Sequence, residues 1–158
     1  NRLNLEIIRT DELLIEAKEM MDQLVPSNNI QINFNLLPEN PLKLKVRGNK
    51  ELLRLAINNI LSNACKYSNN KPVFVSLVAT HNEIIMNIKD QGIGIPPSEI
   101  QYIYDPFFRA SNTKAYDGYG IGLPLTRNII RIHQGSLEVE SVAQQGVTVK
   151  IKLPMLFV

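Results

Sequence analysis

The chain has 158 residues, 44% of them hydrophobic, which suffices for one compact domain with a real core. Its 17 basic and 15 acidic residues are spread along the sequence and give a formal net charge of +2, so charge points neither to nucleic acid nor to a membrane surface as partner. The single cysteine, Cys65, excludes an internal disulfide and a cysteine zinc cluster, which fits a reducing cytoplasmic compartment.

The first third of the chain predicts a strand, a helix and two further strands. Residues 4–8 alternate polar and apolar side chains like a short strand, and Thr10 or Asp11 is then expected to cap a helix that ends before the next proline. Residues 30–34 and 42–46 alternate in the same way, as half-buried strands do, on either side of a proline-containing turn.

The middle of the chain predicts the longest helix and a hairpin. Gly48 and Asn49 supply a break and an N-cap, and apolar residues at helical spacing then continue to about Tyr67. Residues 73–80 and 83–90 read as two strands joined by a short polar turn, and the second strand runs directly into a glycine-rich segment.

A glycine- and proline-rich stretch from residue 91 to 122 is too long for an ordinary connection, so we expect a functional loop. Residues 123–133 return to helical spacing, and 136–142 and 147–153 form a closing strand pair. These elements predict an α/β (α+β) two-layer sandwich, in which three main helices cover one face of a mixed, mostly antiparallel sheet and the glycine loops lie on the helix side.

Three polar side chains lie close together on the predicted long helix. Asn59, Asn63 and Lys66 fall within a stripe about 60° wide that borders the apolar face. Amide oxygens are ligands for a hard cation such as magnesium, and lysine meets phosphate, so the stripe suits a bound nucleotide. The alternative is the solvated flank of an amphipathic helix. The neighbouring Tyr67 either lies against a purine ring or is a core residue.

Two glycine runs flank a region with aromatic residues. After the hairpin, Asp90 is followed by Gly92 and Gly94. A carboxylate able to accept an adenine amino hydrogen would then lie beside a backbone that a ligand can approach closely. The alternative is a turn in which Asp90 caps local amides. The second run, 118–122, opens a helix whose free amides suit phosphate, unless it is a flexible hinge. Between the runs, Arg109 follows two phenylalanines and precedes a polar stretch, as in an anchored lid or a pinned surface loop.

Taken in order, these segments resemble the N, G1, F, G2 and G3 boxes of sensor histidine kinase ATP-binding domains, members of the GHKL ATPase superfamily. The likeness covers nearly the whole chain and departs from the usual pattern at Gln144, where a glycine is common. The motifs that carry it are Asn59-Ile-Leu-Ser-Asn63-Ala-Cys-Lys66-Tyr67, Asp90-Gln-Gly92-Ile-Gly94, Asp105-Pro-Phe107-Phe108-Arg109, Gly118-Tyr-Gly120-Ile-Gly122-Leu123 and, in the closing strands, Gly135, Glu140-Ser141 and Gly146-Val-Thr148.

The resemblance implies that the domain binds ATP and magnesium. It gives catalytic roles to Asn59, Lys66 and Arg109, with Asn59 and Lys66 beside the phosphates, and it makes Asn63 the magnesium ligand. Asp90 would bind the adenine amino group. The other residues implied to contact or shape the nucleotide site are Tyr67, Gly92, Gly94, Ile95, Gly118, Tyr119, Gly120, Ile121, Gly122, Leu123 and, behind Asp90, Thr148.

The residue at position 59 separates kinase from ATPase. Superfamily members that hydrolyse ATP, such as gyrase-type and chaperone ATPases, carry a glutamate four residues before the metal-binding asparagine as the base that activates water. Here that position is Asn59, and an amide does not accept a proton near neutral pH. We therefore expect ATP to be held for transfer to an external nucleophile.

Neither histidine suits the phosphoacceptor that such kinases carry on a separate helical hairpin. His81 falls in a predicted turn, and His133 ends a helix, where a structural role is expected. The chain begins at Asn1 and shows no signal peptide or transmembrane segment. We expect residues 1–158 to be the catalytic domain from the cytoplasmic portion of a longer sensor kinase. Its partners would be the phosphoacceptor and dimerisation domain and, indirectly, a response regulator.

Two other functions share the same pocket and stay open at this point. One is a free-standing serine kinase of the anti-sigma type. The other is a non-catalytic module that regulates a partner through nucleotide-dependent docking.

Overall fold

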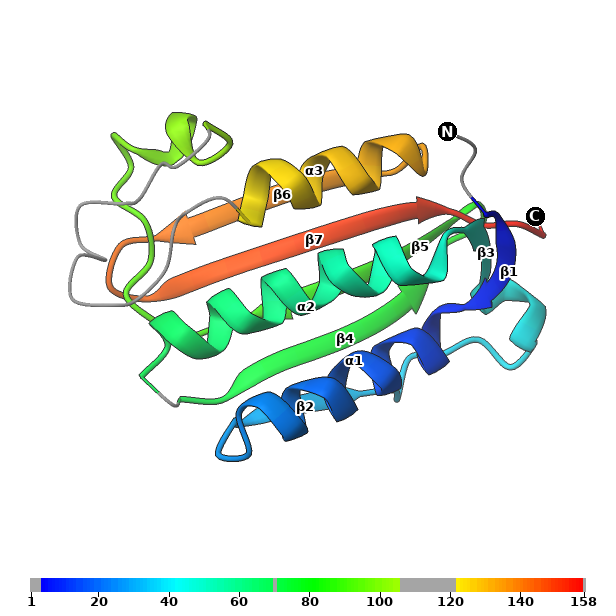
Figure 1. Ribbon diagram of the computed structural model, residues 1–158, viewed down its shortest axis with the longest axis horizontal. Helices are drawn as coiled ribbons and strands as arrows, with labels where there is room; N and C mark the ends of the chain where they lie inside the picture. Colours follow the sequence, from blue (N-terminus) through cyan, green and yellow to red (C-terminus); the bar gives the residue numbers. More distant parts are fainter. Residues whose placement is uncertain (1–3, 70, 106–121, 158) are drawn as a thin grey trace.

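The computed structural model describes residues 4–69, 71–105 and 122–157, and over these ranges it consists of two layers (Figure 1). Three helices lie side by side on one face of a five-stranded sheet, which confirms the predicted fold class. The helices are α1 (Thr10–Leu24), α2 (Lys50–Tyr67) and α3 (Gly122–Ile132). The sheet order is β2-β4-β5-β7-β6, with β2 (Ile30–Asn33), β4 (Val73–Ala79), β5 (Glu83–Lys89), β6 (Ser136–Val142) and β7 (Gly146–Pro154).

The sheet is mixed because its first pair is parallel: β2 runs alongside β4 with Ile30 opposite Val73. The other three pairs are antiparallel. Alternation along β4 and β5 places every second side chain in the core under the helices. On β5 those residues are Ile84, Met86 and Ile88, a period of two that the run of three apolar residues at 84–86 hides in the sequence.

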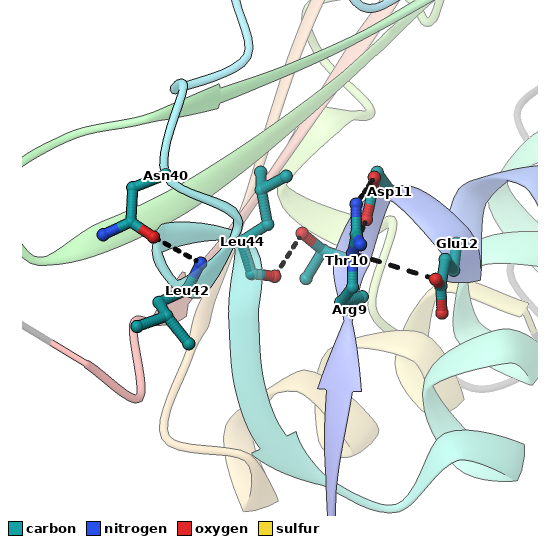
Figure 2. A network of polar contacts seen from close by, with 7 residues as sticks. All are labelled: Arg9, Thr10, Asp11, Glu12, Asn40, Leu42 and Leu44. Carbon is teal, nitrogen blue, oxygen red and sulfur yellow. Dashed lines mark hydrogen bonds and ion pairs between the residues drawn. The ribbon is translucent and has the colours of Figure 1, made fainter.

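The start of α2 follows the predicted mechanism, and the start of α1 does not. Asn49 caps α2 by accepting a hydrogen bond from Leu52 N at 2.9 Å. The prediction that Thr10 or Asp11 caps α1 is wrong, since the N-cap is Arg9 and its side chain makes no capping bond. Thr10 is instead fully buried, and its hydroxyl donates to Leu44 O at 2.8 Å (Figure 2).

The segment before α2 also differs from the prediction. Residues Pro41–Leu44 form a short 3-10 helix, η1, because the Asn40 side chain accepts a hydrogen bond from Leu42 N at 3.1 Å and turns the chain (Figure 2). The following strand, β3 (Lys45–Gly48), pairs antiparallel with β1 (Glu6–Arg9) in a separate two-stranded sheet. Only the second half of the predicted strand at 42–46 is therefore extended.

Different structural elements lie at the two ends of the sandwich (Figure 1). One end carries both termini and the β1–β3 sheet. The other gathers the C-terminal end of α2, the segment after β5 with its short 3-10 helix η2 (Ile100–Tyr102), the turn between β6 and β7, and the beginning of α3. Most of the residues predicted to bind nucleotide thus lie at one end. Within the described ranges, no helix combines the length and apolarity that crossing a membrane requires.

Candidate functional site

The polar stripe on α2 lies on the flank of the helix that faces α3. Asn59, Asn63 and Lys66 are all half-buried, so none of them is a freely solvated side chain. Asn58, about 100° away around the helix axis, points toward α1 and donates to Ala17 O at 3.0 Å. Because α2 packs between α1 and α3, the stripe is turned toward α3. This favours the binding interpretation over a solvated flank.

The buried carboxylate of Asp90 is held by two main-chain amides. Asp90 is only 7% exposed, and its Oδ1 accepts hydrogen bonds from Gly92 N at 2.9 Å and Val147 N at 3.0 Å. Burial raises the pKa of Asp90 above its ordinary value, while the two amides act in the opposite direction. Both bonds use Oδ1, and no donor reaches Oδ2 from the part of the chain that the structure describes. Oδ2 therefore remains an acceptor for a ligand amino group.

Residues 90–95, the Asp90 loop, are packed against main chain on both sides. A Cβ on Gly92 would lie 2.2 Å from Tyr67 O, and Ile93 N donates to that same oxygen at 3.3 Å. On the other side, a Cβ on Gly94 would lie 2.3 Å from Val142 O, and the φ of Gly94 is +69°. Both glycines are thus required by contact with the protein itself, a reason that the sequence did not reveal.

Support for Asp90 comes from β7, as the resemblance implied, although the observed contact is one residue away from the expected one. The residue that bonds to Asp90 is Val147, through its main chain in both directions. Thr148 is the next residue, half-buried and opposite Lys89 in the sheet register. A direct role of the Thr148 side chain stays a prediction.

The beginning of α3 lies at this same end of the molecule (Figure 1). Gly122 is the first residue of α3 and Leu123 follows it, half-buried. The remaining residues of the predicted phosphate and lid region, Arg109, Gly118, Tyr119, Gly120 and Ile121, lie outside the described residues.

A contact that the sequence did not predict joins α3 to the segment that follows β5. The guanidinium carbon of Arg127 lies 4.0 Å from the centroid of the Tyr104 ring, within the range of a cation–π interaction. Ile103, the residue before Tyr104, is buried. Burial raises the pKa of Tyr104, and the positive charges of Arg127 and Arg131 oppose that rise.

The two histidines occupy the structural settings expected for them. His81 lies exposed between β4 and β5. His133 is buried directly after α3, where Nδ1 lies 2.7 Å from Ile129 O and Nε2 accepts a hydrogen bond from Asn49 N at 3.0 Å. Through these two contacts the ring joins the end of α3 to the cap of α2. Cys65 is half-buried, and burial raises the pKa of its thiol, as in an unreactive cysteine.

Comparison with known proteins identifies the family. Residues 48–156 match the sequence model described as histidine kinase-, DNA gyrase B- and HSP90-like ATPase, and the chain belongs to this family. It is 32% identical over 146 residues to the adaptive-response sensory kinase SasA of Synechocystis, covering 91% of this chain and 37% of that protein. It is 29% identical over 159 residues to the sensor histidine kinase WalK of Bacillus subtilis, covering 98% of this chain and 25% of that protein. The chain thus spans about a quarter to two fifths of the length of these relatives.

Solved structures support the same fold. A mycobacterial sensor histidine kinase, MprB, superposes with a TM-score of 0.81 at 27% identity, covering 94% of this chain and 97% of that one. The catalytic domain of the histidine kinase ThkA superposes with a TM-score of 0.78 at 21% identity, covering 97% and 99% of the two chains. The three helices on a mixed sheet are therefore the fold of histidine kinase catalytic domains, and family membership supports ATP as the nucleotide of the domain.

Proposed function

We propose that this chain is the ATP-binding catalytic domain of a sensor histidine kinase, formed by residues 1–158. It would bind Mg-ATP and donate the γ-phosphate to a histidine on the phosphoacceptor and dimerisation domain of a longer cytoplasmic assembly, which then passes the phosphate to a response regulator. The observation that carries the proposal is that the loop after Asp90 contacts Tyr67, the last residue of the helix that carries the polar stripe, in a chain of this ATPase family.

The base would be recognised by Asp90. Its Oδ1 is occupied by Gly92 and Val147, so Oδ2 is left to accept a hydrogen from the exocyclic amino group of adenine. A guanine offers a carbonyl oxygen at the equivalent position, which a carboxylate repels. Tyr67 is half-buried and contacts the loop through its main-chain carbonyl, and its ring would provide an aromatic surface beside the base.

The phosphates and the metal would be held by α2 and the start of α3. Lys66 supplies a cation at the end of the stripe, and the first amides of α3, from Gly122 and Leu123, have no partner within the helix and would bind phosphate oxygens. Among the described residues, no three His, Cys, Asp or Glu side chains form a group able to hold a metal. A magnesium ion here would thus take amide oxygen from Asn63 and most of its remaining ligands from phosphate and water, which suits this ion.

Transfer to an acceptor, and not hydrolysis, follows from Asn59. It lies one turn before Asn63 on the same flank, where a carboxylate would be needed to activate water. An amide orients a ligand by hydrogen bonding without removing its proton. The proposed role of Asn59 is therefore to position the phosphates, with Lys66 and Arg109 stabilising charge during transfer.

Isothermal titration of the domain with ATP tests binding. We expect binding that depends on magnesium, and we expect Asn63→Ala to weaken Mg-ATP binding at least about tenfold while leaving magnesium-free binding nearly unchanged. Asn128→Ala, which removes the same side chain from an exposed position on α3, should leave the affinity unchanged. Equal affinities with and without magnesium in the unaltered domain would contradict the magnesium part of the proposal, and absence of any ATP binding would contradict the whole.

The phosphate acceptor is tested with radiolabelled ATP and the longer protein that carries these residues. Acid-labile phosphate on a histidine outside residues 1–158 supports the proposal. Acid-stable phosphoserine on a separate partner would identify a serine kinase of the anti-sigma type. ATP binding without transfer to any protein would identify a regulatory module.

A further inference from the structure

One polar side chain on the β6–β7 hairpin lies where the strand pattern calls for an apolar one. Leu137 and Val139 project from β6 toward the helices and pack against the core. Because side chains alternate along a strand, Ser141 projects from the same face as these two. Its hydroxyl is therefore directed toward the layer that contains the Asp90 loop and not toward the open face of the sheet.

The hydroxyl of Ser141 binds both main-chain groups of Ile95, 46 residues earlier in the sequence. Ile95 N donates to Ser141 Oγ at 2.6 Å, and Ser141 Oγ lies 3.3 Å from Ile95 O, to which it donates. This pair of bonds attaches the last residue of the Asp90 loop to the end of β6. A hydroxyl is the smallest side chain able both to accept from an amide and to donate to a carbonyl.

The same hairpin contacts the rest of the loop through its main chain. Gln144 N donates to Ile93 O at 2.6 Å, and Gly94 lies against Val142 O. Gln144 has a φ of +66°, a conformation that costs a residue with a side chain roughly 1–2 kcal/mol. The turn thus keeps Gln144, whose amide bonds to the Asp90 loop, in an unfavourable backbone conformation.

At the other end of the loop, Val147 bonds Asp90 twice. The loop is therefore attached to the hairpin at Asp90, Ile93 and Ile95, and between these points Gly94 adopts a φ of +69°. The hairpin bonds described above use Asp90 N and Oδ1, Ile93 O and the main chain of Ile95, and so leave Asp90 Oδ2 to the ligand.

We propose that Ser141 is a positioning residue for nucleotide recognition: through Ile95 it fixes the Asp90 loop in the conformation that presents the Asp90 carboxylate to adenine. This inference rests on the proposed function. It adds one point to that function: selectivity for the adenine base depends on a hydroxyl of the β6–β7 hairpin that bonds to the main chain of Ile95.

Hydrogen exchange of the nucleotide-free domain tests the positioning without any ligand. In Ser141→Ala, we expect faster exchange at the Ile95 amide, which loses its acceptor, and also at the Gly92 amide, whose acceptor is the Asp90 carboxylate. Amides in the middle of α1 should keep their rates. Faster exchange confined to Ile95 would overturn the proposal, because the loop would then hold Asp90 in place without Ser141.

Nucleotide titration tests the consequence for selectivity. Ser141→Ala should weaken Mg-ATP binding about three- to tenfold while changing Mg-GTP binding less than about twofold, so that the ratio of the two affinities falls. Ser141→Thr keeps the hydroxyl and should restore the ratio. Ser136→Ala, the same change at an exposed position of β6, is the matched control and should alter neither affinity.

Equal weakening of both nucleotides, or an unchanged ratio in Ser141→Ala, would overturn the inference. A thermal melt of each variant shows whether the domain is folded, so a loss of fold is recognised separately. If the unaltered domain binds neither nucleotide, the proposed function fails, while the exchange rates at Gly92 still decide whether Ser141 positions the loop.

Discussion

Asp90 and Val147 bond to each other twice: Asp90 N donates to Val147 O at 2.9 Å, and Val147 N donates to Asp90 Oδ1 at 3.0 Å. The first bond continues the pairing of β5 with β7 by one residue, and the second replaces a strand carbonyl with a carboxylate oxygen. Asp90 thus lies directly after the end of the central strand β5, and its side chain is oriented by the sheet. That orientation leads to two predictions.

Asp90→Asn should abolish most adenine recognition without unfolding the domain. The amide oxygen of asparagine still accepts from Gly92 and Val147, and the NH₂ group then faces the amino group of adenine, donor against donor. We expect ATP binding to weaken about 10- to 100-fold by titration, since hydrogen bonds to charged groups contribute about 1.5–3 kcal/mol. Asp22→Asn on the exposed side of α1 should bind ATP normally. Normal ATP affinity in Asp90→Asn would contradict the assigned role.

The same variant should change how stability depends on pH. The pKa of Asp90 is raised in the folded state from the ordinary value of 3.8, so the folded protein holds this proton to higher pH than the unfolded chain. The contribution of Asp90 to stability is fully present below pH 3.8 and is lost as pH rises through the raised pKa. Urea unfolding should therefore show the unaltered domain losing stability relative to Asp90→Asn as pH rises above 3.8. If the difference in free energy of unfolding between the two proteins stayed constant with pH, Asp90 would not be a buried charge in the folded domain.

Features determined by short stretches of chain were predictable from the sequence. Asn49 could be predicted to cap α2 because its side chain accepts a hydrogen bond from an amide only three residues later. The strand before the first glycine run and the helix after the second were likewise predicted from local spacing of apolar residues. The aspartate at the end of β5 and the polar flank of α2 are likewise local patterns. The fold class and most of the candidate site residues could therefore be proposed before the structure was considered.

Features that depend on packing between distant segments were not predictable. Ser141 belongs to the segment that resembles the last family box, but its partner Ile95, 46 residues away, is found only in the folded structure. Thr10 resembles a cap, yet its hydroxyl binds Leu44 O across the core. Arg127 resembles a solvated helix residue until Tyr104 lies under its guanidinium. In each case the sequence gives the residue type and only the tertiary structure supplies the partner.

The buried histidine provides a stability test. His133 accepts from Asn49 N and pairs with Ile129 O, so His133→Phe leaves a donor and an acceptor without partners. We expect the free energy of unfolding to fall by about 1–3 kcal/mol in urea. His81→Phe, the same substitution in the exposed turn, should change it by less than about 0.5 kcal/mol. Equal effects at the two positions would contradict the bridging role of His133.

The end of α3 provides a stabilising substitution. Gln134 has a φ of +62°, and the bonds from Gln134 N to Arg131 O and from Gly135 N to Ile130 O close the helix with the pattern that usually places glycine at this position. Gln134→Gly removes a conformational cost of about 1–2 kcal/mol and adds an entropic cost of about 0.5–1 kcal/mol, so we expect a net gain near 0.5–1 kcal/mol. The melting temperature should rise, whereas Gln145→Gly, at a residue without positive φ, should lower it.

The contact between Arg127 and Tyr104 joins the middle of α3 to the segment that follows the Asp90 loop, and a double-mutant cycle measures its strength. Arg127→Met and Tyr104→Leu each remove one partner of a half-buried pair whose guanidinium lies 4.0 Å from the ring centroid. We expect a coupling energy of about 0.5–2 kcal/mol in urea unfolding, since half-buried cation–π pairs fall in that range. Arg127→Lys retains the charge and loses the planar stack, so it should recover only part of the coupling. Additive effects of the two substitutions would show that the two side chains are not energetically coupled, and α3 would then be held in place by its packing on α2 and β6.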